Sequence, residues 1–278
     1  MLPRLVIPGI GGVPSHELFV GLAVLVTVGL GLFWSVRREG LPAGPVLLAF
    51  ALLVVAAFAG GRLHFAMTKW HLFEASPWRV LRLSTGGLHA PGAIAGVTLG
   101  GLFIVRAVGL PLGRFVDGIA PAVAIGILLG RLGCFLNGCC YGEVCTLPWG
   151  LSLGPESYPY RAQVEAGVLA RDASASLPVH PLPLYFSAVA AGIAVFLLWL
   201  RPRKAYDGQL GLWLLFLFSL SSTVLEPLRA DHESRIYWGP LPQLLWVGLG
   251  MTALSLAALV AARVRFRGTL RSAESGSG

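Results

Sequence analysis

A few charged residues interrupt strongly apolar stretches of this sequence and could carry chemistry. Arg131 follows an apolar run that begins near Asp117, so on a helix it lies about fourteen residues, or about 21 Å, from that start. Glu226, Arg229 and Asp231 close another apolar run, and Glu226 and Arg229 have the three-residue spacing that places two side chains on one helix face. Two guanidinium groups and a carboxylate at one level suit the phosphate of a lipid head group.

Each of these charges also has a structural interpretation. An arginine inside a membrane costs at least about 2.5 kcal/mol on insertion scales unless it finds a partner or reaches the interface. Arg131 could therefore form an ion pair, and Glu226 with Arg229 could stabilise helix packing. Asn137, near the end of the same run as Arg131, could cap a helix. Arg62, which follows two glycines, could bring another cation to the site or extend to the interface.

Two histidines are candidate general bases, because the unperturbed pKa of histidine is near neutrality. His89 lies in S-T-G-G-L-H-A-P-G-A-I-A-G at 84–96, and His180 opens H-P-L-P-L-Y, which ends at Tyr185. The glycines and proline of 84–96 predict irregular backbone, which at membrane depth must be buried in protein or line a cavity. A structural role remains the alternative for each histidine.

Four cysteines, Cys134, Cys139, Cys140 and Cys145, lie within twelve residues. Their spacing matches no C-x-x-C template for zinc or redox chemistry. Three interpretations stay open, in this order: buried thiols, a disulfide, and a metal site.

The elements that position these residues are membrane-spanning helices. The chain of 278 residues is 55% hydrophobic and 12% charged, with a mean hydropathy of +0.74, which excludes a water-soluble core. A helix needs about twenty apolar residues to cross a bilayer core of about 30 Å. We therefore predict an all-α integral membrane protein with about seven transmembrane helices, at 17–36, 44–62, 92–110, 116–137, 182–200, 209–226 and 239–262. The first is too long for the apolar core of a signal peptide, so we expect it to be retained.

The distribution of basic residues predicts the orientation. The net charge of +8 is spread over alternate loops and does not form the single patch expected for nucleic-acid binding. Dense basic clusters follow the first, fifth and seventh predicted spans, and by the positive-inside rule these loops are cytoplasmic. The N-terminus is then outside and the C-terminus cytoplasmic. The longer loops at about 63–91 and 138–181 face outward.

We expect a single polytopic membrane domain at 1–270, because no internal repeat divides the sequence. The polar stretch 143–180 between spans four and five predicts a small extramembrane head or lid. The Ser- and Gly-rich tail 271–278 predicts disorder.

The run D-G-I-A-P-A-V-A-I-G-I-L-L-G-R-L-G-C-F-L-N-G-C-C-Y-G at 117–142 resembles the signature of the prolipoprotein diacylglyceryl transferase family. Further resemblance comes from G-G-R-L at 60–63, G-G-L-H-A-P-G-A-I-A-G at 86–96, L-P-W-G at 147–150, H-P-L-P-L-Y at 180–185, L-E-P-L-R-A-D-H-E at 225–233, and Gln243. These segments follow the family's order through nearly all of the predicted spans.

The resemblance implies a multi-pass enzyme of the bacterial inner membrane with its active site on the periplasmic side. Its implied partners are phosphatidylglycerol, a lipobox-containing preprolipoprotein and the bilayer, and it implies no metal and no cofactor. The implied reaction transfers the diacylglyceryl group to the lipobox cysteine thiol as a thioether. The resemblance carries over Arg131, Asn137, Gly142 and Glu226. Together with the candidates chosen from the residues themselves, we expect catalytic Arg131, Glu226 and His89, with Arg131, Asn137, Arg229, Arg62, Gly142, His180 and Tyr185 at the phospholipid head group.

Several positions depart from the family pattern. Pro91 stands where the family has histidine or tyrosine, and Ser222 where it has an arginine. Cys134 and Cys139 replace asparagine and glutamate, and the family's H-P-S-Q-L-Y-E ends here in Phe186. Two alternatives follow: a divergent relative that binds anionic phospholipid or uses another acceptor, and a membrane thiol redox protein that uses the cysteines.

Overall fold

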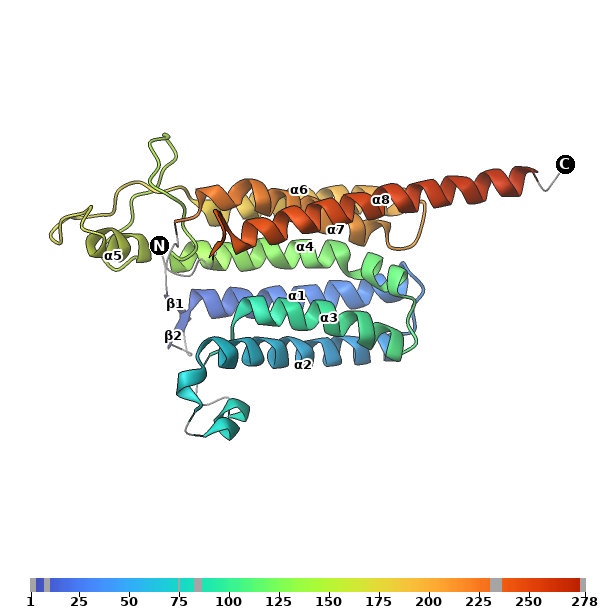
Figure 1. The fold of residues 1–278 in the computed structure, drawn as a ribbon, viewed down its shortest axis with the longest axis horizontal. Coiled ribbons are helices and arrows are strands. Elements are labelled where there is room, and N and C mark those ends of the chain that lie inside the picture. The colour runs from blue at the N-terminus through green and yellow to red at the C-terminus, as the bar shows by residue number, and fades with distance from the viewer. Residues whose placement is uncertain (1–3, 8–10, 75, 83–86, 231–236, 276–278) are drawn as a thin grey trace. The chain divides into compact units, whose positions relative to one another are not determined.

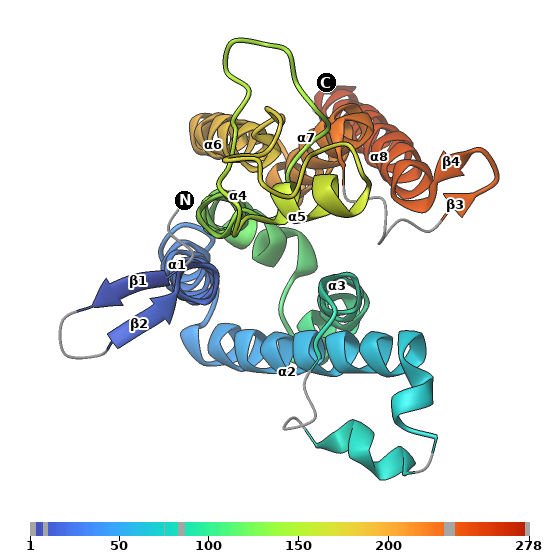
Figure 2. The same ribbon diagram turned by 90° about the vertical axis from the view of Figure 1, so that its left-hand side faces the viewer.

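The structure is a computed structural model that describes residues 4–7, 11–74, 76–82, 87–230 and 237–275. It is mostly α-helical (Figures 1 and 2). The chain forms two compact units, one of residues 32–118 and the other of residues 1–31 together with 119–278. We describe each unit by itself.

The long helices agree with the predicted spans. They are α1 Ser15–Arg37, α2 Ala43–Thr68, α3 Ala90–Ala107, α4 Leu112–Asn137, α6 Leu182–Leu200, α7 Gln209–Leu225 and α8 Gln243–Ser275. Six helices of the described chain are long and apolar enough to cross a membrane, and α3 is a shorter apolar helix. The prediction of an all-α integral membrane protein is confirmed, whereas its orientation stays a prediction.

The unit of residues 32–118 is built on α2 and α3, which lie side by side (Figure 1). Their glycines allow backbone to meet backbone: a Cβ on Gly92 would collide with the Gly60 carbonyl oxygen, and one on Gly96 with the Ala56 carbonyl oxygen. This is the small-residue packing typical of membrane helices. Irregular backbone through 84–96 was therefore wrong for its second half, which is regular helix from Ala90; residues 84–86 lie outside the described residues.

In the other unit, α4, α6 and α7 share a small apolar core (Figure 2). The core contains Ala120 and Ala124 from α4, Ile193 and Leu197 from α6, and Leu210 from α7, all at most 5% exposed. Alanines on α4 allow the larger side chains of α6 and α7 to approach closely, as dense packing requires.

Small residues also allow α8 to approach α7 closely and α1 to approach α4 closely. Gly248 of α8 faces the hydroxyl of Thr223, and one turn later the Thr252 Oγ1 donates to Ser219 Oγ of α7 at 3.1 Å. Gly133 of α4 faces the first turns of α1, where a Cβ would lie 2.7 Å from the Cβ of Phe19. Close contact at Gly133 matters because it brings the start of α1 to the end of α4.

Between α4 and α6 the chain leaves the helical layer and forms a small head that contains α5, Tyr158–Glu165 (Figure 1). Two hairpins, β1 Arg4–Ile7 with β2 Gly11–Pro14 and β3 Tyr237–Trp238 with β4 Leu241–Pro242, precede α1 and α8. α8 continues as helix to Ser275, into the tail that we predicted to be disordered; residues 276–278 lie outside the described residues.

Candidate active site

Arg131 lies in the last turns of α4, as the sequence predicted. Its guanidinium stacks on the ring of Phe186 in the first turns of α6, 4.4 Å from the ring centroid. The side chain is half-buried, and it has no ion pair within the described part of the chain. A stacked guanidinium is held in position while its N–H groups remain available to an anion.

The backbone that follows α4 contains Gly142 and hydrogen bonds to the segments that carry His180 and Arg229. The Gly142 N–H donates to the His180 carbonyl oxygen at 3.0 Å, and the Glu143 N–H donates to the Leu228 carbonyl oxygen at 2.8 Å. Gly142 and Arg229 pair as an antiparallel bridge. A Cβ at Gly142 would lie 2.6 Å from the His180 Cβ and 2.6 Å from the Leu228 oxygen, so only glycine fits there without a shift.

His180 and Tyr185 form a short polar chain with Trp149. The His180 Nδ1 lies 3.1 Å from the Tyr185 hydroxyl, and the Trp149 indole N–H donates to the same hydroxyl at 2.7 Å. Trp149 comes from the head, whereas Tyr185 belongs to the first turn of α6. The chain therefore ties the head to the helix that carries Phe186.

Glu226 follows directly on α7 and begins a 3₁₀ turn, η5 (Glu226–Leu228). Its side chain is only 6% exposed. Asn137 is the last residue of α4, and its side chain lies beside that of Cys139. Arg229 is half-buried at the end of η5, and Asp231 lies outside the described residues.

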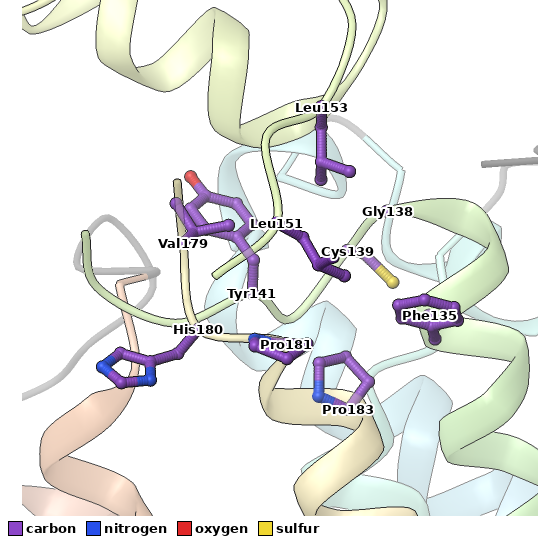
Figure 3. A pocket seen from close by; sticks show the side chains of 10 residues that line it. All are labelled: Phe135, Gly138, Cys139, Tyr141, Leu151, Leu153, Val179, His180, Pro181 and Pro183. Carbon is purple, nitrogen blue, oxygen red and sulfur yellow. The ribbon is translucent and has the colours of Figure 1, made fainter. Parts of the chain in front are cut away.

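A small apolar pocket lies beneath the head (Figure 3). Phe135, Cys139, Leu151, Val179 and Pro183 are among its lining residues. The Cys139 sulfur points toward Phe135, and the imidazole of His180 extends away from the other labelled side chains (Figure 3). The pocket is too small for a lipid head group, so the candidate site consists of the polar side chains around it.

Arg62, in the unit of residues 32–118, is 6% exposed, and its guanidinium hydrogen bonds to backbone carbonyl oxygens. Its guanidinium donates to Val80 O at 2.6 Å, Arg82 O at 2.8 Å, Arg79 O at 3.0 Å and Gly87 O at 3.2 Å. It also lies 5.3 Å from the ring centroid of Phe73. These contacts suit a residue that holds the loop after α2; its role as a phosphate ligand stays a prediction that they do not favour.

His89, directly before α3 in the same unit, lies in a polar cluster. Its Nδ1 is 3.2 Å from the His64 Nδ1 and 3.2 Å from the Thr68 hydroxyl of α2. Burial first, and then the charges of His64 and Lys69, lower the pKa of His89 below its ordinary value. A lowered pKa keeps the imidazole neutral, which is the form that accepts a proton.

The structure also identifies neighbours that the sequence did not single out as site residues. Phe186 entered only as a departure from the family pattern and Trp149 only within a motif, yet they contact Arg131 and Tyr185. His64, two residues after Arg62, had no role in the prediction. Its one sequence signal was its position four residues before Thr68, on the same face of α2.

Six helices of the described chain are long enough to cross a membrane, and a polar, arginine-containing site lies where α4 and α7 end, so the protein is a polytopic membrane protein with a candidate site at the ends of these two helices. A family model described as prolipoprotein diacylglyceryl transferase matches residues 10–261. The chain belongs to this family.

Curated relatives agree with this assignment. The chain is 29% identical over 261 residues to the phosphatidylglycerol–prolipoprotein diacylglyceryl transferase of Nostoc sp., covering 91% of this chain and 86% of the relative. It is 27% identical over 263 residues to the protein of the same name from Corynebacterium diphtheriae, covering 91% and 90%. A shorter match to the Chloroflexus aggregans protein of that name is 34% identical, covering 54% and 48%.

Proposed function

We propose that this chain transfers the diacylglyceryl group of phosphatidylglycerol to the lipobox cysteine thiol of a preprolipoprotein. The observation that carries the proposal is the stacking of Arg131 on Phe186. Arg131 belongs to the signature segment at 117–142, and both residues lie within the part of the chain that the family model matches. A half-buried cation without an ion pair among the described residues suits a phosphate ester whose leaving group gains negative charge.

In the proposed reaction, the acceptor thiol loses its proton and the sulfur attacks the glycerol carbon that bears the phosphate ester. A C–S bond forms, the C–O bond to phosphate breaks, and glycerol phosphate leaves with the electron pair. Arg131 stabilises the charge that develops on the leaving phosphate. Arg229 and the Asn137 amide supply further donors to the same head group.

His89 stays the candidate general base, because its lowered pKa keeps the imidazole in the neutral form that accepts a proton. Glu226 is buried and three residues from Arg229, and we assign its carboxylate to balance the positive charge of the site. His180 and Tyr185 hold the head against the start of α6.

We also propose that the site faces the periplasm in the bacterial inner membrane. Within the unit of residues 1–31 and 119–278, α4 and α7 end at the site, and α6 and α8 begin there. The basic cluster Arg201, Arg203 and Lys204 lies at the opposite ends of α6 and α7. The positive-inside rule makes that opposite end cytoplasmic.

The test is incubation of purified protein in nanodiscs that contain phosphatidylglycerol with a lipobox peptide, followed by mass spectrometry for the diacylglyceryl adduct. A peptide with serine in place of the lipobox cysteine is the acceptor control, and nanodiscs of phosphatidylethanolamine are the donor control. An adduct on the cysteine peptide alone, and with phosphatidylglycerol alone, supports the proposal. Folded protein that yields no adduct, or modifies both peptides equally, overturns it.

A further inference from the structure

Three of the four cysteines form one cluster where α4 ends. The side chains of Cys134, Cys139 and Cys140 lie close enough to interact with one another, and the Cys139 Sγ lies 3.6 Å from the Cys134 carbonyl oxygen. Cys140 has a φ of 57°, the one positive φ at a non-glycine position among the described residues. This left-handed conformation is uncommon outside glycine, and here it accompanies a turn that gathers three thiols.

A histidine from a distant part of the sequence joins this cluster. One ring nitrogen of His16, in the first turn of α1, and the sulfurs of Cys134 and Cys139 all lie within 4.8 Å of one another. Gly133 makes this approach possible, because a side chain there would meet Phe19. The contact lies entirely within one compact unit.

The His16 ring has an unused polar atom. Its Nδ1 is inaccessible to solvent and has no hydrogen-bond partner within the described part of the chain. A buried polar atom without a partner costs about 1–3 kcal/mol, so such atoms are rare and call for an explanation. A ligand bound between the imidazole and the thiols would supply such an explanation.

We propose that His16, Cys134 and Cys139 form a binding site for a thiophilic metal ion, with Zn²⁺ as the ion and Cys140 as the fourth ligand. Tetrahedral zinc has Zn–S distances of about 2.3 Å and Zn–N distances of about 2.0–2.1 Å, which place neighbouring donors about 3.5–3.8 Å apart. Donors within 4.8 Å reach this arrangement by side-chain shifts of about 1 Å.

The charge of such a site can be balanced. Three thiolates and one Zn²⁺ carry a net charge of −1, and the Arg131 guanidinium interacts electrostatically with Cys140. The site departs from the expectation of no metal, which rested on sequence spacing and family resemblance. It does not depend on diacylglyceryl transfer, and the test below does not measure transfer.

Cys145 provides a matched control. It is a buried thiol only five residues beyond Cys140, but its sulfur belongs to the head, where the Cys145 backbone N–H donates to the Pro178 carbonyl oxygen at 2.7 Å. It is not a member of the group of donors around His16. Replacing it tests the general effect of removing a buried thiol from this region.

The experiment uses the full chain in detergent, reduced and treated with chelator under anaerobic conditions, and titrated with Co²⁺ as a spectroscopic probe. We expect thiolate-to-cobalt charge-transfer bands and intense tetrahedral d–d bands that saturate at one equivalent and disappear when Zn²⁺ is added. His16→Ala, Cys134→Ser and Cys139→Ser should each weaken binding at least about tenfold. Cys145→Ser should bind as the parent chain does.

Absence of saturable thiolate bands in the folded parent chain overturns the proposal. An equal loss of binding in Cys145→Ser and Cys134→Ser does the same. Unchanged affinity in His16→Ala removes His16 as a ligand and with it the proposed site. If a serine variant fails to fold, by its thermal transition, His16→Gln takes its place, because it keeps a polar side chain but no imidazole.

Discussion

The stacking of Arg131 on Phe186 leads to a quantitative prediction about catalysis. Arg131→Ala removes the cation that faces the leaving phosphate, and loss of one such preorganised donor lowers kcat by about 10²–10³. Phe186→Leu keeps an apolar side chain at a position that is 3% exposed but removes the ring, 4.4 Å from the guanidinium carbon. A cation–π contact of about 0.5–2 kcal/mol corresponds to about a 2- to 30-fold lower rate.

The decisive measurement is the double variant. If the ring acts by positioning Arg131, then Arg131→Ala with Phe186→Leu should be no slower than Arg131→Ala alone, because neighbouring residues that act together are not additive. The assay is kcat and KM for transfer to the lipobox peptide, with quantities of folded protein matched by thermal transition. Arg161→Ala, an exposed arginine of the head paired with Glu156, should leave both constants within about twofold.

Two results would refute this reasoning. Full transfer by Arg131→Ala would remove the arginine from the chemistry. Multiplicative losses in the double variant would show that Phe186 acts independently of Arg131, through packing or through direct contact with lipid.

Three further predictions follow from the same structure. Gly142→Ala should lower the free energy of unfolding by about 1–3 kcal/mol, measured by thermal unfolding in detergent, because its Cβ would meet His180 and a backbone oxygen. Arg62→Lys should make the loop after α2 more sensitive to protease with little change in KM, because lysine cannot bridge the same carbonyls. His89→Gln should remove part of the loss of stability as the pH falls below 6.5, because the unfolded chain binds a proton near that value and the folded chain, with its lowered pKa, does not.

Each of these has a contrary outcome. An unchanged thermal transition in Gly142→Ala would mean that the backbone pairing around it can shift without loss. A raised KM with unchanged proteolysis in Arg62→Lys would restore the phosphate-ligand role. Stability profiles of the parent chain and His89→Gln that run parallel below pH 6.5 would show that His89 protonates alike in both states.

Hydropathy and spacing predicted the helices well because they are local properties. Most spans are largely apolar runs of membrane length, so their ends follow from composition, and observed helices such as α4 and α6 begin and end close to the predictions. Irregular backbone at 90–96 was predicted wrongly because glycine permits both unusual conformations and close helix contact. Only the neighbouring helix, with Gly60 facing Gly92, decides between the two.

For the candidate site residues too, the sequence indicated some features and only the tertiary structure showed others. The signature segment pointed to Arg131 and Gly142 as candidates without a structure, because the residue types and their order carry the family resemblance. Their neighbours come from other elements: Phe186 from α6 lies on Arg131, and Leu228 from η5 accepts the bond beside Gly142. No local pattern contains that information.

The sequence by itself determined that the chain is a helical membrane protein and which family it resembles, since apolar length and motif order are written along one dimension. Tertiary structure decided what each polar side chain contacts. Arg62 and Arg131 are both arginines at the ends of apolar runs, yet backbone carbonyls surround one and an aromatic ring supports the other. His16 has no cysteine near it in sequence and lies beside two in space, because Gly133 lets α1 approach α4. Chemistry depends on such contacts between distant segments, and only the packed chain brings them together.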